Sequence, residues 1–93
     1  MTTKAMNDAS GTITSGGNAQ TALTDNDART YLFILNVSDT TMYVNFGVTA
    51  VADSPSIPLL AGAALTFEGA YVPGDYVSVI GATTAKKFII KHA

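Results

Sequence analysis

The segment TYLFILNVSDTTMYVNF, residues 30–46, decides the fold class of this chain. Its first part, Thr30–Val37, is apolar on both faces at its centre, and such a strand belongs in the middle of a sheet with other structure packed on each side. Its second part, Thr41–Phe46, alternates apolar and polar residues from Met42 onward, as a strand with one buried face does. Three polar residues, 38–40, form a turn between the two parts. The segment therefore predicts a β-hairpin and an all-β protein.

Shorter strand patterns recur along the rest of the chain. Pro55 and Pro58 accompany the segment 56–60, and because proline cannot donate a hydrogen bond to a ladder, this segment is predicted to be an edge strand or an extended crossing. Other strands are predicted at 11–14, 18–23, 63–68, 75–80 and 86–91. Strands at a spacing of about 8–12 residues are typical of sandwiches and barrels. We therefore expect a small antiparallel β-sandwich or a jelly-roll-like barrel.

The first 17 residues differ in composition from the remainder. They are polar and small, and Ile13 is their only large aliphatic residue apart from two methionines. Such a segment cannot bury enough apolar surface to order itself. We expect an extended N-terminal arm at 1–17, either disordered or ordered on a neighbouring molecule, followed by a single β-sandwich domain at 18–93.

The composition restricts the classes of function. The net charge of −2 argues against nucleic-acid binding, since phosphates require a basic surface. No segment approaches the roughly 20 apolar residues that span a bilayer, and the N-terminus lacks the apolar stretch of a signal peptide. The 93 residues include no cysteine and only 13% charged residues. A small domain without disulfides is commonly reinforced by association, so we expect a homo-oligomer or docking on a larger partner.

Candidate catalytic and metal-binding residues do not form a recognisable constellation. Asp25-Asn26-Asp27 resembles the start of a calcium loop, but the later ligand positions are not acidic, so a polar turn is the preferred interpretation. Asn36-Val37-Ser38 matches the glycosylation sequon and is interpreted as the end of a strand. The single histidine, His92, lies at a terminus where fraying would prevent it from acting as a preorganised base. We predict no enzyme activity, no cofactor and no metal.

Two kinds of side chain are candidates for partner contacts. Exposed tyrosines either stack on sugar rings or anchor a protein interface. Lysines near the C-terminus form either a basic patch for an acidic partner or the protective charges of an edge strand. The predicted partner-binding residues, including those of the arm, are Thr2, Thr3, Lys4, Ile13, Tyr43, Tyr71, Lys86, Lys87 and Lys91.

Six segments together resemble a known group of proteins. They are SGGNAQT at 15–21, the arginine and aromatic-aliphatic strand RTYLFI at 29–34, NVSDTTMYVNFG at 36–47, SIPL at 56–59, AGAALTFE at 61–68 and VPGDYVSVIGATTAKKF at 72–88. In this order the chain resembles small virion-associated proteins of tailed bacteriophages, which are compact β-domains. The resemblance covers about residues 15 to 90 and contains no active-site motif.

The resemblance implies a structural role on a phage particle. We expect a capsid decoration or cement protein that binds the major capsid protein or other virion proteins and stabilises contacts between capsomers. It would be made in the host cytoplasm and located on the capsid surface, and the resemblance suggests a trimer. A tail, head-fibre or adaptor component of the virion is the first alternative, and a small carbohydrate-binding β module is the second.

Overall fold

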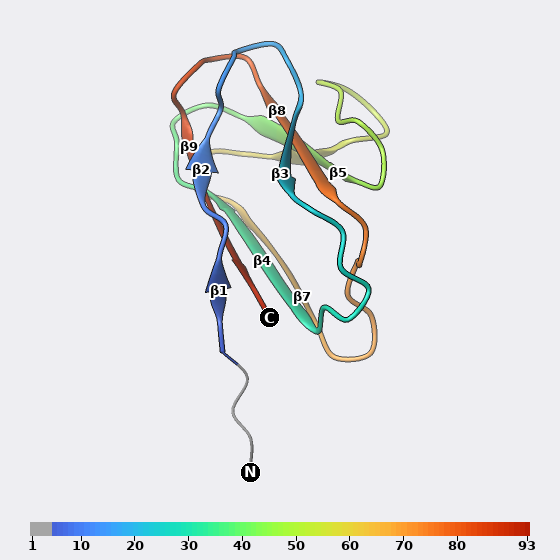
Figure 1. The fold of residues 1–93 in the computed structure, drawn as a ribbon. Coiled ribbons are helices and arrows are strands. Elements are labelled where there is room, and N and C mark those ends of the chain that lie inside the picture. The colour runs from blue at the N-terminus through green and yellow to red at the C-terminus, as the bar shows by residue number, and fades with distance from the viewer. Residues whose placement is uncertain (1–4) are drawn as a thin grey trace.

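The computed structural model describes residues 5–93, and its strands form two antiparallel sheets packed as a β-sandwich (Figure 1). Sheet A has the order β1-β9-β4-β7, with β2 also paired to β9, and sheet B has the order β3-β8-β5-β6. The strands are β1 (Asn7–Asp8), β2 (Gly11–Thr12), β3 (Gln20–Leu23), β4 (Tyr31–Asn36), β5 (Met42–Phe46), β6 (Ile57–Leu59), β7 (Ala64–Glu68), β8 (Val77–Gly81) and β9 (Lys87–His92). The prediction of an all-β sandwich is confirmed.

The core lies between the inward faces of the two sheets. Sheet A contributes Leu32 and Ile34 of β4, and sheet B contributes Met42 and Val44 of β5. The other core side chains are Ile13, Leu23, Leu59, Val77, Val79, Phe88 and Ile90. The rings of Phe46 and Phe67 meet edge to face across the layers, with their centroids 5.4 Å apart, a favourable arrangement of two aromatic quadrupoles. The predicted inward alternation of β5 is confirmed.

The predicted hairpin is wrong, although the limits of its two strands are nearly correct. β4 belongs to sheet A and β5 to sheet B, so residues 37–41 carry the chain from one sheet to the other. Both strands have one fully buried apolar row, and these rows face each other across the core instead of lying side by side in one sheet. Alternation and a short polar loop are compatible with either arrangement, so the local pattern could not distinguish them.

β4 lies in the interior of its sheet, as predicted, but the predicted packing of other structure on both of its faces is not found among the strands of residues 5–93. It lies between β9 and β7, in the interior of sheet A. Leu32, Ile34 and Asn36 are buried, whereas the outward Tyr31, Phe33 and Leu35 are only partly buried. Because every strand within residues 5–93 belongs to one of the two sheets, no third layer of strands covers this outward face.

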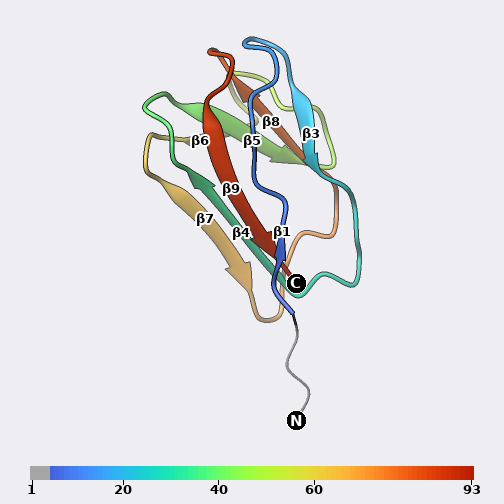
Figure 2. The ribbon, with the colours of Figure 1, turned by 60° about the vertical axis from the view of Figure 1, so that its left-hand side comes forward.

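The described part of the segment predicted as an arm lies along sheet A (Figure 2). β1 and β2 pair with β9, with Asn7 opposite His92 and Gly11 opposite Phe88. Beyond them, Ile13 is 0% exposed, and its side chain packs closely against Gly81. Residues 7–17 are therefore part of the sandwich, which differs from the predicted division after residue 17.

Three further predictions about strands can be compared with the structure. β6 is an edge strand, as its prolines indicated. β9 lies between β1 and β4, so the interpretation of its lysines as edge-strand protection is wrong. His92 is not frayed, since it lies in β9 opposite Leu32.

Residues 5–93 form no helix, and hence none that could cross a membrane.

Candidate interaction surface

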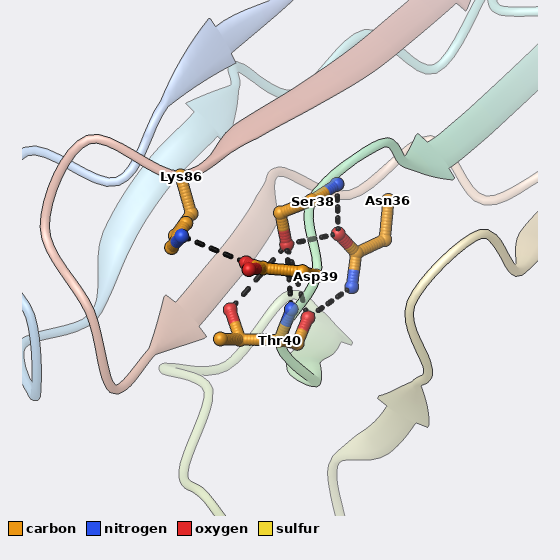
Figure 3. Close-up of polar contacts among 5 residues, drawn as sticks. All are labelled: Asn36, Ser38, Asp39, Thr40 and Lys86. Atoms are coloured by element: carbon orange, nitrogen blue, oxygen red, sulfur yellow. Dashed lines mark hydrogen bonds and ion pairs between the residues drawn. The ribbon is translucent and has the colours of Figure 1, made fainter.

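The turn between the sheets is held by a buried amide (Figure 3). The Nδ2 of Asn36 donates to the carbonyl oxygens of Thr40 (2.7 Å) and Leu59 (2.8 Å). Its Oδ1 accepts from the backbone N–H of Ser38 at 2.9 Å and from the Ser38 hydroxyl at 2.6 Å. Asn36 is 0% exposed, and a buried amide with all its hydrogen bonds satisfied is a structural group. Its nitrogen is not accessible for glycosylation in the folded chain.

A buried arginine ties together the loops at the other end of β4. Arg29 donates from Nη1 to the carbonyl oxygen of Pro73 (2.7 Å) and from Nη2 to that of Thr24 (2.7 Å). Burial lowers the pKa of this guanidinium, and the nearby Asp25 and Asp75 partly oppose that shift. An arginine remains charged at neutral pH even so. Arg29 therefore joins the loops around 24 and 73 and has a structural role.

The C-terminal lysines do not form one open basic patch. The Nζ of Lys86 lies 2.7 Å from a carboxylate oxygen of Asp39, and that of Lys91 lies 3.0 Å from Asp8. The hydrogen bond from Lys86 lowers the pKa of the Asp39 carboxyl. The pKa of Asp8 is lowered first by its hydrogen bond from the Ser10 side chain and then by Lys91. Exposed pairs of this kind contribute little to stability.

The remaining predicted contact residues are scattered. Thr2, Thr3 and Lys4 lie outside the described residues. Ile13 is a core residue, so its prediction as a partner contact is wrong, because a side chain with no exposed area cannot touch a partner. Tyr43 is partly buried on the outward face of sheet B, and Tyr71 is 80% exposed in the loop after β7. Lys87 is exposed and lies opposite Thr12.

Hydrogen bonds made by Asn26 hold the acidic turn 25–27. The Oδ1 of Asn26 accepts from the N–H of Ala28 at 3.0 Å, and the N–H of Asn26 donates to the carbonyl oxygen of Gly74 at 2.7 Å. Within residues 5–93 no group of three histidine, cysteine, aspartate or glutamate side chains is placed to hold a metal ion. The turn therefore has the polar structural role that its composition indicated.

A loop covers part of the outward face of sheet B. Residues 47–56 fold back over β8, where the N–H of Ala50 donates to the Ser78 hydroxyl at 2.9 Å. The N–H of Val51 donates to the Ser56 hydroxyl at 2.9 Å within the same loop. Both hydroxyl-bearing residues and Ala50 are buried as a result. An open cavity of about 200 Å³ remains beside the loop, between β3 and Tyr76, which is smaller than most ligand pockets.

On the outward face of sheet A, apolar side chains of β4 and β9 remain partly exposed. We call the apolar centre of this outward face, formed by Tyr31, Phe33, Leu35 and Ile89, the sheet A face. Leu35 lies directly opposite Ile89 on β9, and all four side chains are partly buried. Polar and charged residues surround them on the neighbouring strands, namely Asp8, Thr12, Thr66, Glu68, Lys87 and Lys91. An apolar centre with a polar rim is the usual composition of a protein interface.

The sequence predicted that Thr30–Val37, which supplies most of the sheet A face, is a central strand with other structure packed on both of its faces. The alternation placed Tyr31, Phe33 and Leu35 on one face of a central strand, which is correct. It could not show that this face lacks a covering layer, since that depends on where every other strand goes. Ile89 joins them only through the pairing of β4 with β9.

Comparison of the chain with protein-family models, with curated proteins and with solved structures finds no match.

Proposed function

We propose that this chain is a structural protein of a phage virion, and specifically a capsid decoration or cement protein. The observation that carries the proposal is the sheet A face, a partly exposed apolar surface with a charged rim on a small domain. The motif resemblance of about residues 15–90 supports the same role. The low charge content, 13% of residues, also suits a protein that buries much of its surface in an assembly.

The mechanism would be addition of buried area across the seams between capsomers. Tyr31 and Phe33 would supply rigid aromatic contacts, and Lys87 and Glu68 would set the orientation through charges at the rim. Each copy needs only a modest affinity, because many copies on one shell act together when the shell is strained. Separation of capsomers would then require the loss of many such contacts.

Two alternatives use other features of the molecule. A tail, head-fibre or adaptor component would use the same sheet A face at low copy number. A carbohydrate-binding module is favoured by Tyr71, a residue that is 80% exposed and available for stacking on a sugar. Tyr31 and Tyr43 lie on outward faces of different sheets, so these two tyrosines do not share one face.

Copy number is the first test. Quantitative mass spectrometry of purified source virions compares this chain with the major capsid protein. A ratio near one, or a simple fraction such as one third, is expected for a decoration protein. About a dozen copies per particle would favour the tail or adaptor role, and absence from the virion would refute the proposal.

A binding assay tests the surface itself. The variant Phe33→Asp places a charge in the centre of the sheet A face, and Val51→Asp places the same charge on the exposed loop of sheet B as a control. Shells stripped of this protein should bind the control like the unmodified chain and should bind Phe33→Asp at least about tenfold more weakly. Equal binding of both variants would exclude this face as the contact.

A further inference from the structure

The four sheet edges differ in how they are protected against pairing with another chain. In sheet B, β6 contains Pro58, and β3 has a register shift between Thr21 and Leu23. In sheet A, β1 and β2 are two residues each, and the Ser10 hydroxyl between them replaces a ladder bond to β9. Prolines, irregular registers and very short strands are the usual devices that prevent edge pairing.

The fourth edge, β7, has none of these devices. It is five residues long, has the sequence ALTFE and keeps one continuous register with β4. It contains no proline and no lysine, and Glu68 is its only charged residue. Figure 2 shows β7 at the margin of sheet A, with β4 on one side and no strand of residues 5–93 on the other. A regular edge strand of this kind is a template for a further strand.

The direction of the free backbone groups follows from the neighbouring hydrogen bonds. Tyr31 and Ala93 exchange two bonds of 3.1 Å, so the odd-numbered residues of β4 bond toward β9. The N–H of Asn36 donates to the carbonyl oxygen of Ala63 at 3.0 Å, so the even-numbered residues bond toward β7. Antiparallel ladders alternate in this respect. In β7, Leu65 and Phe67 therefore bond to β4, and the three residues that direct N–H and C=O groups away from the sheet are Ala64, Thr66 and Glu68.

We propose that β7 pairs with β7 of a second copy of this chain, antiparallel about a twofold axis at Thr66. In this register Thr66 lies opposite its own symmetry mate, and Ala64 lies opposite Glu68. Every outward N–H of each copy then meets an outward C=O of the other. The result is one continuous sheet across two sandwiches, with an isologous interface of the kind that closes a dimer.

The side chains favour this partner and this register. Leu65 lies opposite Phe67 of the other copy, so the partly buried apolar ends of the two cores extend each other. The two Glu68 carboxylates stand at opposite ends of the pair, about 14 Å apart along the strands, where salt screens their repulsion. A shift that brought Glu68 opposite Glu68 would place like charges together and lose most of the bonds.

This pairing also enlarges the sheet A face. Phe33 is the neighbour of Thr66 across β4 and β7, so the twofold axis brings the two apolar centres onto one side of a single sheet. The inference concerns the purified chain alone and does not depend on the proposed role in a virion.

Sedimentation of the full chain, with a proline variant, tests the dimer. Thr66→Pro removes an N–H that points away from β4, so its own sheet keeps its bonds. Loss of two interchain bonds per dimer should raise the dissociation constant about 30-fold. Thr66→Val keeps the N–H and the branched side chain and should leave the constant unchanged. A chain that is monomeric at all concentrations, or a trimer, would overturn the proposal.

Amide hydrogen exchange of the unmodified chain gives a second test that does not depend on a variant that folds. The amides of Ala64, Thr66 and Glu68 should become protected as the concentration rises, whereas those of Leu65 and Phe67 should be protected throughout. A dimer in which the three outward amides still exchange fast would exclude this edge. Protection that develops only after shells are added would assign the edge to a shell strand and refute self-pairing.

Cross-linking identifies the register. The chain has no cysteine, so Thr66→Cys places one thiol per copy beside the twofold axis, where Cα atoms of a hydrogen-bonded pair lie about 5.5 Å apart, within disulfide range. Thr21→Cys on the edge of sheet B is the control. Oxidation at low concentration should give a covalent dimer of Thr66→Cys and leave Thr21→Cys monomeric. Equal yields would contradict the register.

Discussion

The outward faces of the two sheets differ in what lies on them. Sheet B is partly covered within the chain, because residues 47–56 return over β8 and bury the Ser78 hydroxyl against the N–H of Ala50. Sheet A keeps a row of partly exposed apolar side chains on β4, with Ile89 beside them. A small domain has few residues with which to cover both faces. This difference is the reason that we propose sheet A as the binding side.

The largest expected effect compares the two faces of β4 itself. Ile34→Ala removes a core side chain that is 2% exposed and should lower the free energy of unfolding by about 2–5 kcal/mol. Leu35→Ala, the next residue on the outward face, should cost about 1 kcal/mol or less, because water already reaches that side chain. Urea denaturation measures both. Equal losses would mean that the outward face is as tightly packed as the core.

The second prediction concerns the corner that joins the two sheets. Asn36→Ala removes the amide partner of the Leu59 carbonyl oxygen and of the Ser38 N–H, and it leaves the Thr40 carbonyl oxygen with the Ser38 hydroxyl alone. Buried groups left unpaired should cost about 2–3 kcal/mol of unfolding free energy, again measured in urea. Thr41→Ala, a partly buried position beyond this cluster, is the control. A cost for Asn36→Ala no greater than that of the control would show that the corner does not depend on the amide.

The third prediction tests how the loop 47–56 is held on the outward face of sheet B. Ser78→Ala leaves the buried N–H of Ala50 unpaired and should destabilise the fold by about 1–2 kcal/mol. Because the loop 47–56 loses an anchor, limited proteolysis should cut it faster, while Ser54→Ala, at an exposed position in the same loop, should not change the rate. Unchanged proteolysis in Ser78→Ala would mean that the loop is held by its other contacts.

The smallest expected effect is a dependence of stability on pH that arises from His92, near the C-terminus. Burial lowers the pKa of His92 from its ordinary value of 6.5, with a further contribution from Arg29. The unfolded chain then binds a proton more readily than the folded one, so stability is complete above about pH 6.5 and falls as the pH drops below that value. Thermal unfolding between pH 7.5 and 5.5 should show a small decrease that disappears in His92→Gln. A decrease that persists in the variant would assign it to other groups.

The strand limits were accessible to sequence reasoning because they depend on local chemistry. Alternation identified β5 and β7 and their inward residues, and proline placed β6 at an edge. The three β4 residues of the sheet A face could also be predicted to share one face of a strand. Neither the place of Ile89 beside them nor the exposed edge of β7 could be predicted, because no local signal indicates which strands become neighbours.

Ile13 illustrates the limit of compositional reasoning. Its surroundings, from Ser10 to Gly17, are polar and glycine-rich, which suggested an arm. In the fold the same residue fills a space against Gly81, which lies 68 residues later in the chain and has no side chain of its own. Only the juxtaposition of these two segments makes Ile13 a core residue.

By itself the sequence determined the all-β class, the inward faces of most strands and the positions of the main turns, since each depends on residues a few positions apart. The tertiary structure decided that β4 and β5 belong to different sheets, that a loop buries Ser78 on sheet B while an apolar row of sheet A stays partly exposed, and that β7 is a regular edge strand. Each of these depends on long-range pairing, in which strands with the same alternation can serve as neighbours in a sheet or as opposite layers of a core.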